Sequence, residues 1–236
     1  MAADAPLLVA TVGLHASAST WVFNVARELL IAAYGEAAVM TLYADEIALL
    51  PTRTARAGRH LVVKSHRGSP PLDRWFVERG ARVLVSVRDP RDAAVSMAQR
   101  FRRRLGDTVQ WLLADCEHVE RLEPALLLRY EDRFFDDAAT IERIAETLGV
   151  PVDPVAREAI FARYTTEAVR ELAREVPNLP EERLQMVAGV AMDKVTQILA
   201  PHVGDTRVGK WRDVPPMHQA ELNRIFAGFI ERYGYA

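Results

Sequence analysis

Short runs of consecutive apolar residues alternate along this chain with longer stretches of helical periodicity, and this alternation restricts the possible folds most strongly. The apolar runs span residues 7–12, 60–64, 82–87 and 125–129. The helical stretches span residues 20–34, 72–79, 90–103 and 136–148. Runs that are apolar at successive positions are typical of parallel strands covered on both faces. Strands that alternate with helices in this way predict an α/β fold, a doubly wound parallel β-sheet flanked by helices.

Local signals mark helix boundaries. Gly35 and Gly149 mark the ends of two helices, and Asp89-Pro90 has the form of a helix start. The second half of the chain has a different pattern from the first. Past Pro151 the pattern is helical throughout, and the last helix carries an apolar stripe at residues 222, 225, 226, 229, 230 and 233. We therefore expect a helical C-terminal half. Because there is no internal repeat and no linker-like segment, we expect residues 1–236 to form one domain.

Composition limits the partners of the chain. The 236 residues include 30 Lys and Arg against 32 Asp and Glu, a formal net charge of −2. No overall field therefore favours nucleic acid or an anionic membrane surface. The apolar runs are interrupted by charges well before the ~20 residues that a membrane span needs. We expect no membrane span, and any bound anion must be held by local groups.

The N-terminal segment and the cysteine content indicate the cellular compartment of the protein. The apolar stretch near the N-terminus lacks a basic segment before it and carries Asp4, so we expect no secretory signal. A single cysteine, Cys116, cannot form an internal disulfide and fits a reducing compartment. We expect a cytoplasmic protein.

The loop after the first apolar run has the composition of an anion site. Residues 13–20 read Gly-Leu-His-Ala-Ser-Ala-Ser-Thr and lead from a predicted strand into a predicted helix. The backbone N–H groups of such a loop and the helix N-terminus can hold a phosphate-like anion. The loop lacks the second glycine and the lysine of a Walker A motif, which argues against a P-loop kinase. Taken by itself, the loop favours a plain turn whose hydroxyls cap the helix over an anion site.

Two further polar segments follow predicted strands. Lys64 and His66 end the second apolar run, and Arg88 follows the third, with Ser96 on the helix after it. In open parallel sheets, ligands bind at the carboxyl ends of the strands, so these segments should meet the first loop. The guanidinium fork of an arginine suits a phosphate. The alternative for Arg88 is a salt bridge to a neighbouring aspartate.

Taken together and in order, these segments resemble the soluble, bacterial-type sulfotransferases that use 3′-phosphoadenosine 5′-phosphosulfate (PAPS) as donor. Residues 15–21 correspond to the family's P-[KR]-S-G-[ST]-T-W segment, and residues 64–66 to its K-x-H segment. Residues 88–96 match its R-[DN]-P-x-D-x-x-x-S segment, and residues 130–132 its Y-E-D segment. Residues 206–212 are similar to its glycine-tryptophan loop before the final helix. The resemblance covers most of the chain and implies the P-loop-like version of the α/β fold.

The resemblance also implies roles for individual residues. Lys64 and His66 would be catalytic, with His66 taking a proton from the acceptor hydroxyl and Lys64 neutralising charge on the bridging oxygen. Arg88 and Ser96 would hold the 3′-phosphate, and Tyr130 would contact the adenine region. The 5′-phosphosulfate loop would comprise His15, Ala16, Ser17, Ala18, Ser19, Thr20 and Trp21. Further 3′-phosphate contacts would come from Arg207, Gly209 and Lys210. Trp21 is equally suited to stack on adenine or to fill the core.

The implied reaction is transfer of a sulfuryl group from PAPS to the hydroxyl of a small-molecule, glycan or lipid acceptor, with adenosine 3′,5′-bisphosphate (PAP) as product. The family needs no metal for this reaction, and the six histidines show no ligand spacing. Ala16 replaces the family's basic residue, and Ala18 replaces its glycine. His15 and Arg207 are candidates for the missing charge. A non-catalytic module that senses PAP or PAPS is therefore the alternative function.

A cluster of arginines follows the third predicted strand and helix. Arg100, Arg102, Arg103 and Arg104 lie close together at the end of that helix. Such a cluster is usually a solvated helix end, although it would also attract an anionic acceptor. We expect the solvated arrangement.

Overall fold

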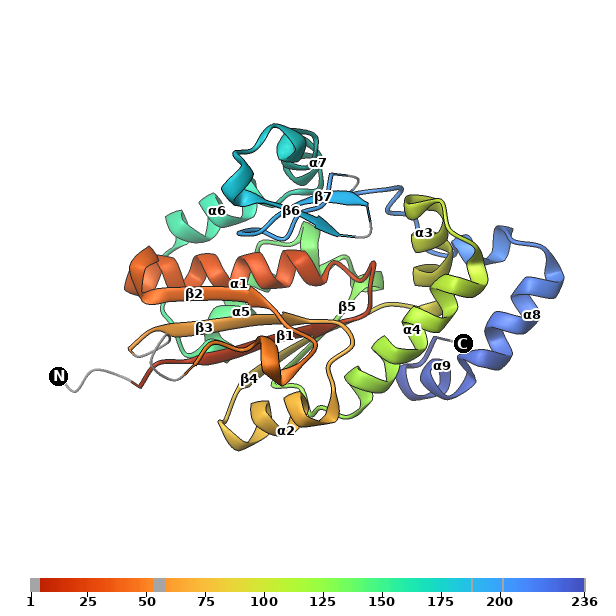
Figure 1. Ribbon diagram of the computed structural model, residues 1–236, viewed down its shortest axis with the longest axis horizontal. Helices are drawn as coiled ribbons and strands as arrows, with labels where there is room; N and C mark the ends of the chain where they lie inside the picture. Colours follow the sequence, from red (N-terminus) through yellow and green to blue (C-terminus); the bar gives the residue numbers. More distant parts are fainter. Residues whose placement is uncertain (1–4, 53–57, 188, 201, 236) are drawn as a thin grey trace.

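Five parallel strands form a sheet in the middle of the molecule (Figure 1). The computed structural model describes residues 5–52, 58–187, 189–200 and 202–235, so Asp4 lies outside the described residues. Within them the strands have the order β2-β3-β1-β4-β5. Their bounds are β1 (Leu8–Gly13), β2 (Val39–Tyr43), β3 (His60–Ser65), β4 (Arg82–Val87) and β5 (Leu126–Arg129). The predicted doubly wound α/β fold is confirmed, with β2 as a strand that the sequence did not predict.

Successive residues of the central strands enter two different hydrophobic cores, because side chains alternate between the faces of a strand. In β1, Ala10 and Val12 face one core and Val9 faces the other. The same alternation holds in β3 and β4, and both faces are fully covered. This explains why these strands are apolar at successive positions.

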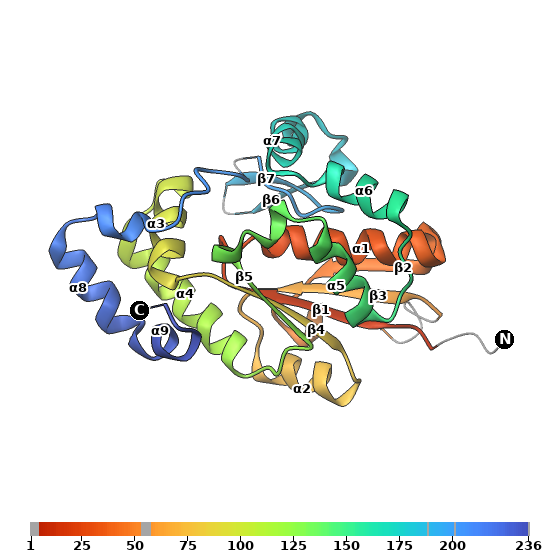
Figure 2. The ribbon, with the colours of Figure 1, turned by 180° about the vertical axis from the view of Figure 1, so that it is seen from behind.

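Helices cover both faces of the sheet (Figures 1 and 2). One core contains side chains of α2 (Pro70–Glu78), α3 (Pro90–Phe101), α4 (Leu105–Glu120), α8 (Pro216–Ile225) and α9 (Ala227–Tyr233). The other contains side chains of α1 (Ser19–Tyr34), α5 (Ala139–Leu148), α6 (Pro154–Arg163) and α7 (Thr166–Glu175). Within the described ranges no helix is both long enough and apolar enough to cross a membrane.

The C-terminal half is largely helical, as predicted, but the prediction that it contains helices throughout was wrong in one region. An antiparallel hairpin, β6 (Leu184–Val187) with β7 (Val190–Asp193), interrupts it. Asp193 fixes the turn that follows, because its carboxylate accepts hydrogen bonds from the backbone N–H groups of Val195 and Thr196 and pairs with Arg183. The final apolar stripe is divided between α8 and α9, because Phe226 leaves the helical conformation between them.

The strand order places a binding site. The chain leaves β1 toward β2 and β3 on one side and continues to β4 and β5 on the other. Loops that leave β1, β3 and β4 therefore diverge at the carboxyl edge of the sheet, which is where ligands bind in open α/β sheets.

Candidate functional site

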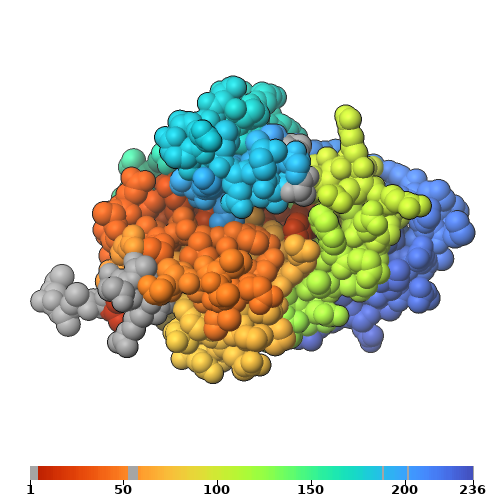
Figure 3. Space-filling view, viewed as in Figure 1, coloured from red at the N-terminus to blue at the C-terminus, as the bar shows by residue number. Residues whose placement is uncertain are grey.

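A cavity of about 1110 Å³ opens at the carboxyl ends of the central strands. Its walls come from the β1–α1 loop, the end of β3, helix α3 and the segment from β6 to residue 210. In the space-filling view, red atoms of the N-terminal region lie between the blue and cyan hairpin segment and the yellow-green α3–α4 segment (Figure 3). The sequence-predicted residues that line the cavity are His15, Ala16, Ala18, Ser19, Thr20, Trp21, Lys64, His66, Arg88, Ser96, Tyr130 and Lys210.

The charge of the cavity wall differs from that of the whole chain. Among its described residues the wall carries one carboxylate, Asp205. Against it stand six cationic side chains, namely Lys64, Arg67, Arg88, Arg100, Lys194 and Lys210. In a chain of net charge −2, this concentration of cations makes the cavity suited to an anionic ligand.

The β1–α1 loop presents backbone N–H groups to the cavity. Ala16 and Ala18 have left-handed conformations, with φ angles of 62° and 61°. Ala18 is also the N-cap of α1 and makes no side-chain cap. Within the described residues, the backbone N–H groups of Ala16, Ala18, Ser19 and Thr20 have no hydrogen-bond acceptor. Loops in which left-handed residues alternate with residues of negative φ form anion-binding structures, and so do uncapped helix N-termini.

Ser17 has a different environment from the rest of the loop. Its hydroxyl is buried, donates to the carbonyl oxygen of Leu14 at 2.7 Å and lies 2.8 Å from the hydroxyl of Ser86 on β4. Gly13 is required beside it, because a Cβ atom there would lie 2.3 Å from Ser86 Oγ. The structure therefore places Ser17 against the sheet and outside the cavity wall.

Lys64 lies buried at the end of β3 and is tied to the start of α1. Its Nζ donates to Thr20 Oγ1 at 2.7 Å. Burial, with the nearby charge of Arg100, lowers the pKa of Lys64 from 10.5 to about 7. An anion bound beside Lys64 would favour its charged form.

His66 is held as a neutral imidazole with a defined tautomer. Its Nδ1 lies 2.5 Å from the carbonyl oxygen of Gly13, which can only accept, so Nδ1 carries the proton and Nε2 the lone pair. Burial, together with the charges of His15 and Lys64, holds the pKa of His66 well below 6.5. His66 is therefore available as a proton acceptor at neutral pH.

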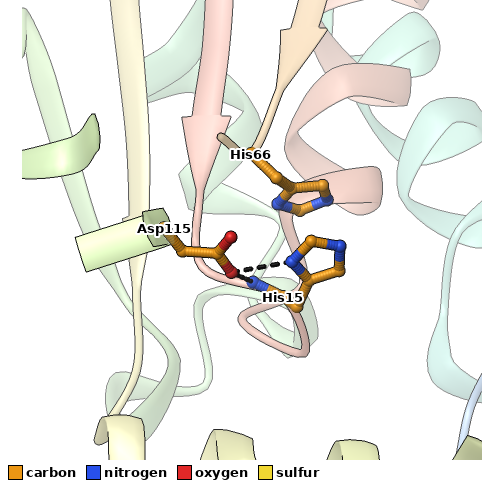
Figure 4. Close-up of side chains that lie close together, drawn as sticks. All are labelled: His15, His66 and Asp115. Atoms are coloured by element: carbon orange, nitrogen blue, oxygen red, sulfur yellow. Dashed lines mark hydrogen bonds and ion pairs between the residues drawn. The ribbon is translucent and has the colours of Figure 1, made fainter. Parts of the chain in front are cut away.

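His15 forms a cluster with His66 and with Asp115 of α4 (Figure 4). Asp115 Oδ2 accepts hydrogen bonds from the backbone N–H and from Nδ1 of His15, both at 2.7 Å. The imidazole of His15 stacks on that of His66 with centroids 3.9 Å apart. Ligand atoms of the three residues lie within 4.8 Å of one another. However, stacked rings do not direct their nitrogens at one point, and both Nδ1 atoms already have oxygen partners, so the arrangement orients the two imidazoles.

Arg88 lies 2% exposed after β4 and has several partners. Its guanidinium donates to the carbonyl oxygens of Ala16 at 3.1 Å and of Arg207 at 3.0 Å. It also lies 3.5 Å from the carboxylate of Asp92 and stacks over the Tyr130 ring at 4.0 Å. The salt bridge considered as the alternative for Arg88 is therefore present with Asp92, although Arg88 still reaches the cavity wall.

The segment 205–211 brings Lys210 next to Ser96. Lys210 Nζ donates to Ser96 Oγ at 3.2 Å. Asp92 holds the segment in place, because its carboxylate accepts from the backbone N–H groups of Gly209 at 2.6 Å and Trp211 at 3.0 Å. Gly209 lies outside the cavity lining and has a left-handed φ of 85°, which glycine adopts readily.

Arg207 contributes backbone, not side chain, to this end of the cavity. Its side chain is 54% exposed, forms a 2.5 Å ion pair with Asp213 and is absent from the described lining. The structure thus separates Arg207 from the position of the missing charge at Ala16.

Besides Asp115, two groups at the site were missed by sequence reasoning. Asp45 follows the unpredicted β2 and accepts from Tyr43 OH at 2.6 Å and from the backbone N–H groups of His66 and Arg67, both at 3.0 Å. Burial acts to raise the pKa of Asp45, but these donors outweigh it and the pKa lies below its usual value. Asp45 thereby fixes the backbone around His66.

Arg100 is the second, and its expected position in a solvated helix end was wrong. Its side chain lines the cavity and donates from Nη1 to the carbonyl oxygen of His202 at 2.9 Å. Burial and the charge of Arg88 lower the pKa of Arg100 from 12.5 to about 10. Arg102, Arg103 and Arg104 are exposed, as expected.

Comparisons with known proteins place the fold. No family model and no curated protein matches the sequence. A crystal structure of mouse sulfotransferase SULT7A1 complexed with PAP matches with a TM-score of 0.66 and 15% identity over 95% of this chain and 84% of that one. A structure of retinol dehydratase in complex with retinol and PAP matches with a TM-score of 0.60 and 16% identity over 95% of this chain and 82% of that one. The same enzyme with androsterone and the inactive cofactor PAP gives a TM-score of 0.61, again with 16% identity and coverage of 95% and 82%. At these identities the likeness shows that the chains share a fold.

Proposed function

We propose that this protein is a PAPS-dependent sulfotransferase. The observation that carries the proposal is that residues of five separate motifs, spread from His15 to Lys210, converge on one cation-lined cavity. The fold supports it, because the three solved structures described above were determined with PAP bound.

The two ends of the cavity fit the two anionic groups of the donor. The uncapped N-terminus of α1, with Lys64 and Thr20, would hold the 5′-phosphosulfate. Arg88, Ser96 and Lys210 would hold the 3′-phosphate. Tyr130 and Trp21 also line the cavity and would supply aromatic surface for adenine.

The geometry gives each reacting group a role. PAPS, when bound, supplies a sulfuryl group whose bond to the bridging phosphate oxygen breaks as the bond to the acceptor oxygen forms. His66 would accept the acceptor proton at Nε2, because its Nδ1 is committed to Gly13. Lys64 would stabilise charge that develops on the bridging oxygen, and the loop N–H groups would hold the donor oxygens in a preorganised site.

The acceptor would be a hydroxyl-bearing molecule of small-molecule, glycan or lipid type. The cavity wall continues beyond the motif residues into apolar and aromatic side chains, among them Trp111, Met192 and Ile198. We place the reaction in the cytoplasm, since the lone cysteine, Cys116, is buried and fits a reducing compartment, and we treat the whole chain as one catalytic domain.

A non-catalytic PAP-binding module is the second candidate, and Ala16 is the observation that favours it. A loop without its basic residue would hold the donor's 5′ group less tightly. The retained His66, with a defined tautomer and a neutral imidazole, favours the enzyme.

The test has two parts. In a thermal shift assay, PAP should raise the melting temperature more than ADP at equal concentration, because Arg88, Ser96 and Lys210 recognise a 3′-phosphate that ADP lacks; 100 Kd of ligand would give about 2.7 kcal/mol. Equal shifts would remove the support for PAPS as donor. Incubation with PAPS and a panel of sugars, phenols and lipids, followed by mass spectrometry, should then show a sulfate gain. PAP binding with no product from any acceptor class would favour the non-catalytic module.

A further inference from the structure

Arg100 lies on the wall of the cavity and has no carboxylate counter-ion among the residues that the structure describes. Its guanidinium donates to the carbonyl oxygen of His202 and packs over the Phe101 ring at 4.4 Å. Its Nε is buried without a hydrogen-bond partner, and no carboxylate of the described part of the chain pairs with it. A buried guanidinium is costly unless an anion or acceptors satisfy it. The unsatisfied group therefore points to a ligand that the protein binds.

The position of Arg100 assigns it to one end of the cavity. Ser96, which is assigned to the 3′ end, and Arg100 are four residues apart on α3, so Arg100 lies on the same helix face one turn farther along the helix from Arg88. Among charged groups, Arg100 has the largest effect on the pKa of Lys64, which in turn contacts Thr20 at the start of α1. Arg100 is therefore within electrostatic reach of Lys64, which is hydrogen-bonded to the helix start where the loop N–H groups are free.

The same end lacks a cation in the loop itself. Ala16 lines the cavity, but its methyl group carries no charge. His15 does not fill this position, because its Nδ1 is bound to Asp115 and its ring stacks on His66. Arg207 does not fill it either, because its exposed side chain pairs with Asp213.

We propose that Arg100 supplies from helix α3 the positive charge that the β1–α1 loop lacks at Ala16, and that it binds the anionic 5′ group of the nucleotide. This inference rests on the proposed function, and it makes Arg100 a donor-binding residue. The guanidinium would use its free Nε–H, and its contact with the His202 carbonyl would fix its direction. Segment 194–206, which carries His202, would then be coupled to occupation of the 5′ subsite.

The test compares two nucleotides that differ only at the 5′ position. Dissociation constants for PAP and for adenosine 3′-monophosphate are measured by calorimetry on the full chain. Arg100→Gln should weaken PAP binding on the order of 10- to 100-fold, as expected for a charge-assisted contact. Binding of adenosine 3′-monophosphate should stay unchanged, because it has no 5′-phosphate, and this retained binding also shows that the variant is folded. Arg104→Gln, on an exposed neighbouring arginine, is the matched control and should change neither constant.

A second variant moves the charge back to the loop. Arg100→Gln combined with Ala16→Lys should recover most of the lost PAP affinity and leave adenosine 3′-monophosphate unaffected, because Ala16 already accepts a Cβ in its left-handed conformation. Unchanged PAP affinity in Arg100→Gln would overturn the inference while leaving the proposed function intact. Equal weakening of both nucleotides would also overturn it, since it would assign Arg100 a structural role. Failure of the wild-type protein to bind PAP would overturn the proposed function itself.

Discussion

The two ends of the cavity differ in whether their cationic side chains have carboxylate partners. At the β4–α3 end, Arg88 has a carboxylate partner in Asp92 and donates to two backbone carbonyls. At the β1–α1 end, Lys64 and Arg100 have no carboxylate partner among the described residues, and their pKa values are lowered to about 7 and about 10. The end with the complete sequence motif is internally neutralised, whereas the end with the incomplete motif holds charge that no described carboxylate neutralises.

This difference distinguishes residues that stabilise the shape of the site from residues whose charge a ligand would neutralise. Arg88 connects β4, the β1–α1 loop and the segment around Arg207, so it contributes to the shape of the site whether or not a ligand is bound. Lys64 is buried, and Arg100 is half-buried with its Nε enclosed, at a cost in free energy that a bound anion would offset. A variant at the first end should therefore reduce stability, and a variant at the second should alter pH dependence and affinity.

The largest expected effect is on turnover at the β1–α1 end. His66→Ala should lower the turnover number by about 10²- to 10⁴-fold, because a general base contributes that much, while PAP affinity changes little. Turnover is measured by product mass and PAP affinity by calorimetry. His218→Ala, on the exposed side of α8, serves as the control. Wild-type turnover in His66→Ala would mean that the chemistry lies elsewhere.

At the β4–α3 end, the expected effect is on folding. Arg88→Met should reduce the free energy of unfolding by about 3–5 kcal/mol, because it leaves the buried carboxylate of Asp92 without its cation. Adding Asp92→Asn removes that charge and keeps an oxygen for the Gly209 N–H group, so the double variant should recover part of the loss. Urea denaturation measures both. A double variant less stable than the sum of the single changes would show that Asp92 acts through its other bonds.

The third effect concerns pH. The folded-state pKa of Lys64 is lowered from 10.5 to about 7, so the unfolded chain binds this proton more tightly. Charged Lys64 therefore destabilises the fold fully below pH 7, and the cost declines as pH rises toward 10.5. Lys64→Met should stabilise the protein by on the order of a few kcal/mol near neutral pH and by much less near pH 10.5.

The measurement for Lys64→Met is the melting temperature against pH, compared with wild type. A gain that does not depend on pH would mean that the charge of Lys64 is already compensated, and the contrast between the two ends would fail. Saturating PAP should reverse the order near neutral pH, since wild-type Lys64 gains an anionic partner and the variant does not.

The sequence revealed most clearly the strands that are covered on both faces. Apolar residues at successive positions predicted β1, β3 and β4, because each side of these strands enters a core. The two edge strands differ from them. β2 is only partly buried along its length, so its sequence gives a weaker signal. β5 was predicted from its run of leucines, although Leu128 is buried and Leu127 is 36% exposed. The hairpin strands β6 and β7 have four residues each and are mostly exposed or half-buried, which leaves no periodicity to detect.

The residues of the site likewise divide into those that the sequence predicted and those that it did not. The motif residues were predictable because each motif is local and follows a predicted strand. Asp115 was not, because it contacts His15 across 100 positions of sequence. Arg100 was obscured by the three exposed arginines beside it, although its spacing of four from Ser96 is a signal that both lie on one helix face.

The smallest effect tests the loop that connects the two ends. Ala18 has a φ of 61° and a ψ of 25°, a left-handed conformation that costs an L-residue about 1–2 kcal/mol. Ala18→Gly should stabilise the protein by roughly 0.5–1 kcal/mol, because glycine adopts this conformation without a Cβ penalty and this exceeds its extra entropy in the unfolded chain. Ala32→Gly, in the right-handed last turn of α1, is the matched control and should destabilise by up to about 0.5–1 kcal/mol. Opposite signs in urea denaturation would show that the loop conformation is under backbone strain. If both substitutions destabilise equally, the packing of the Ala18 methyl group outweighs that backbone strain. The start of α1 at Ala18 would then be no more strained than the start of α3, which the Asp89 side chain caps.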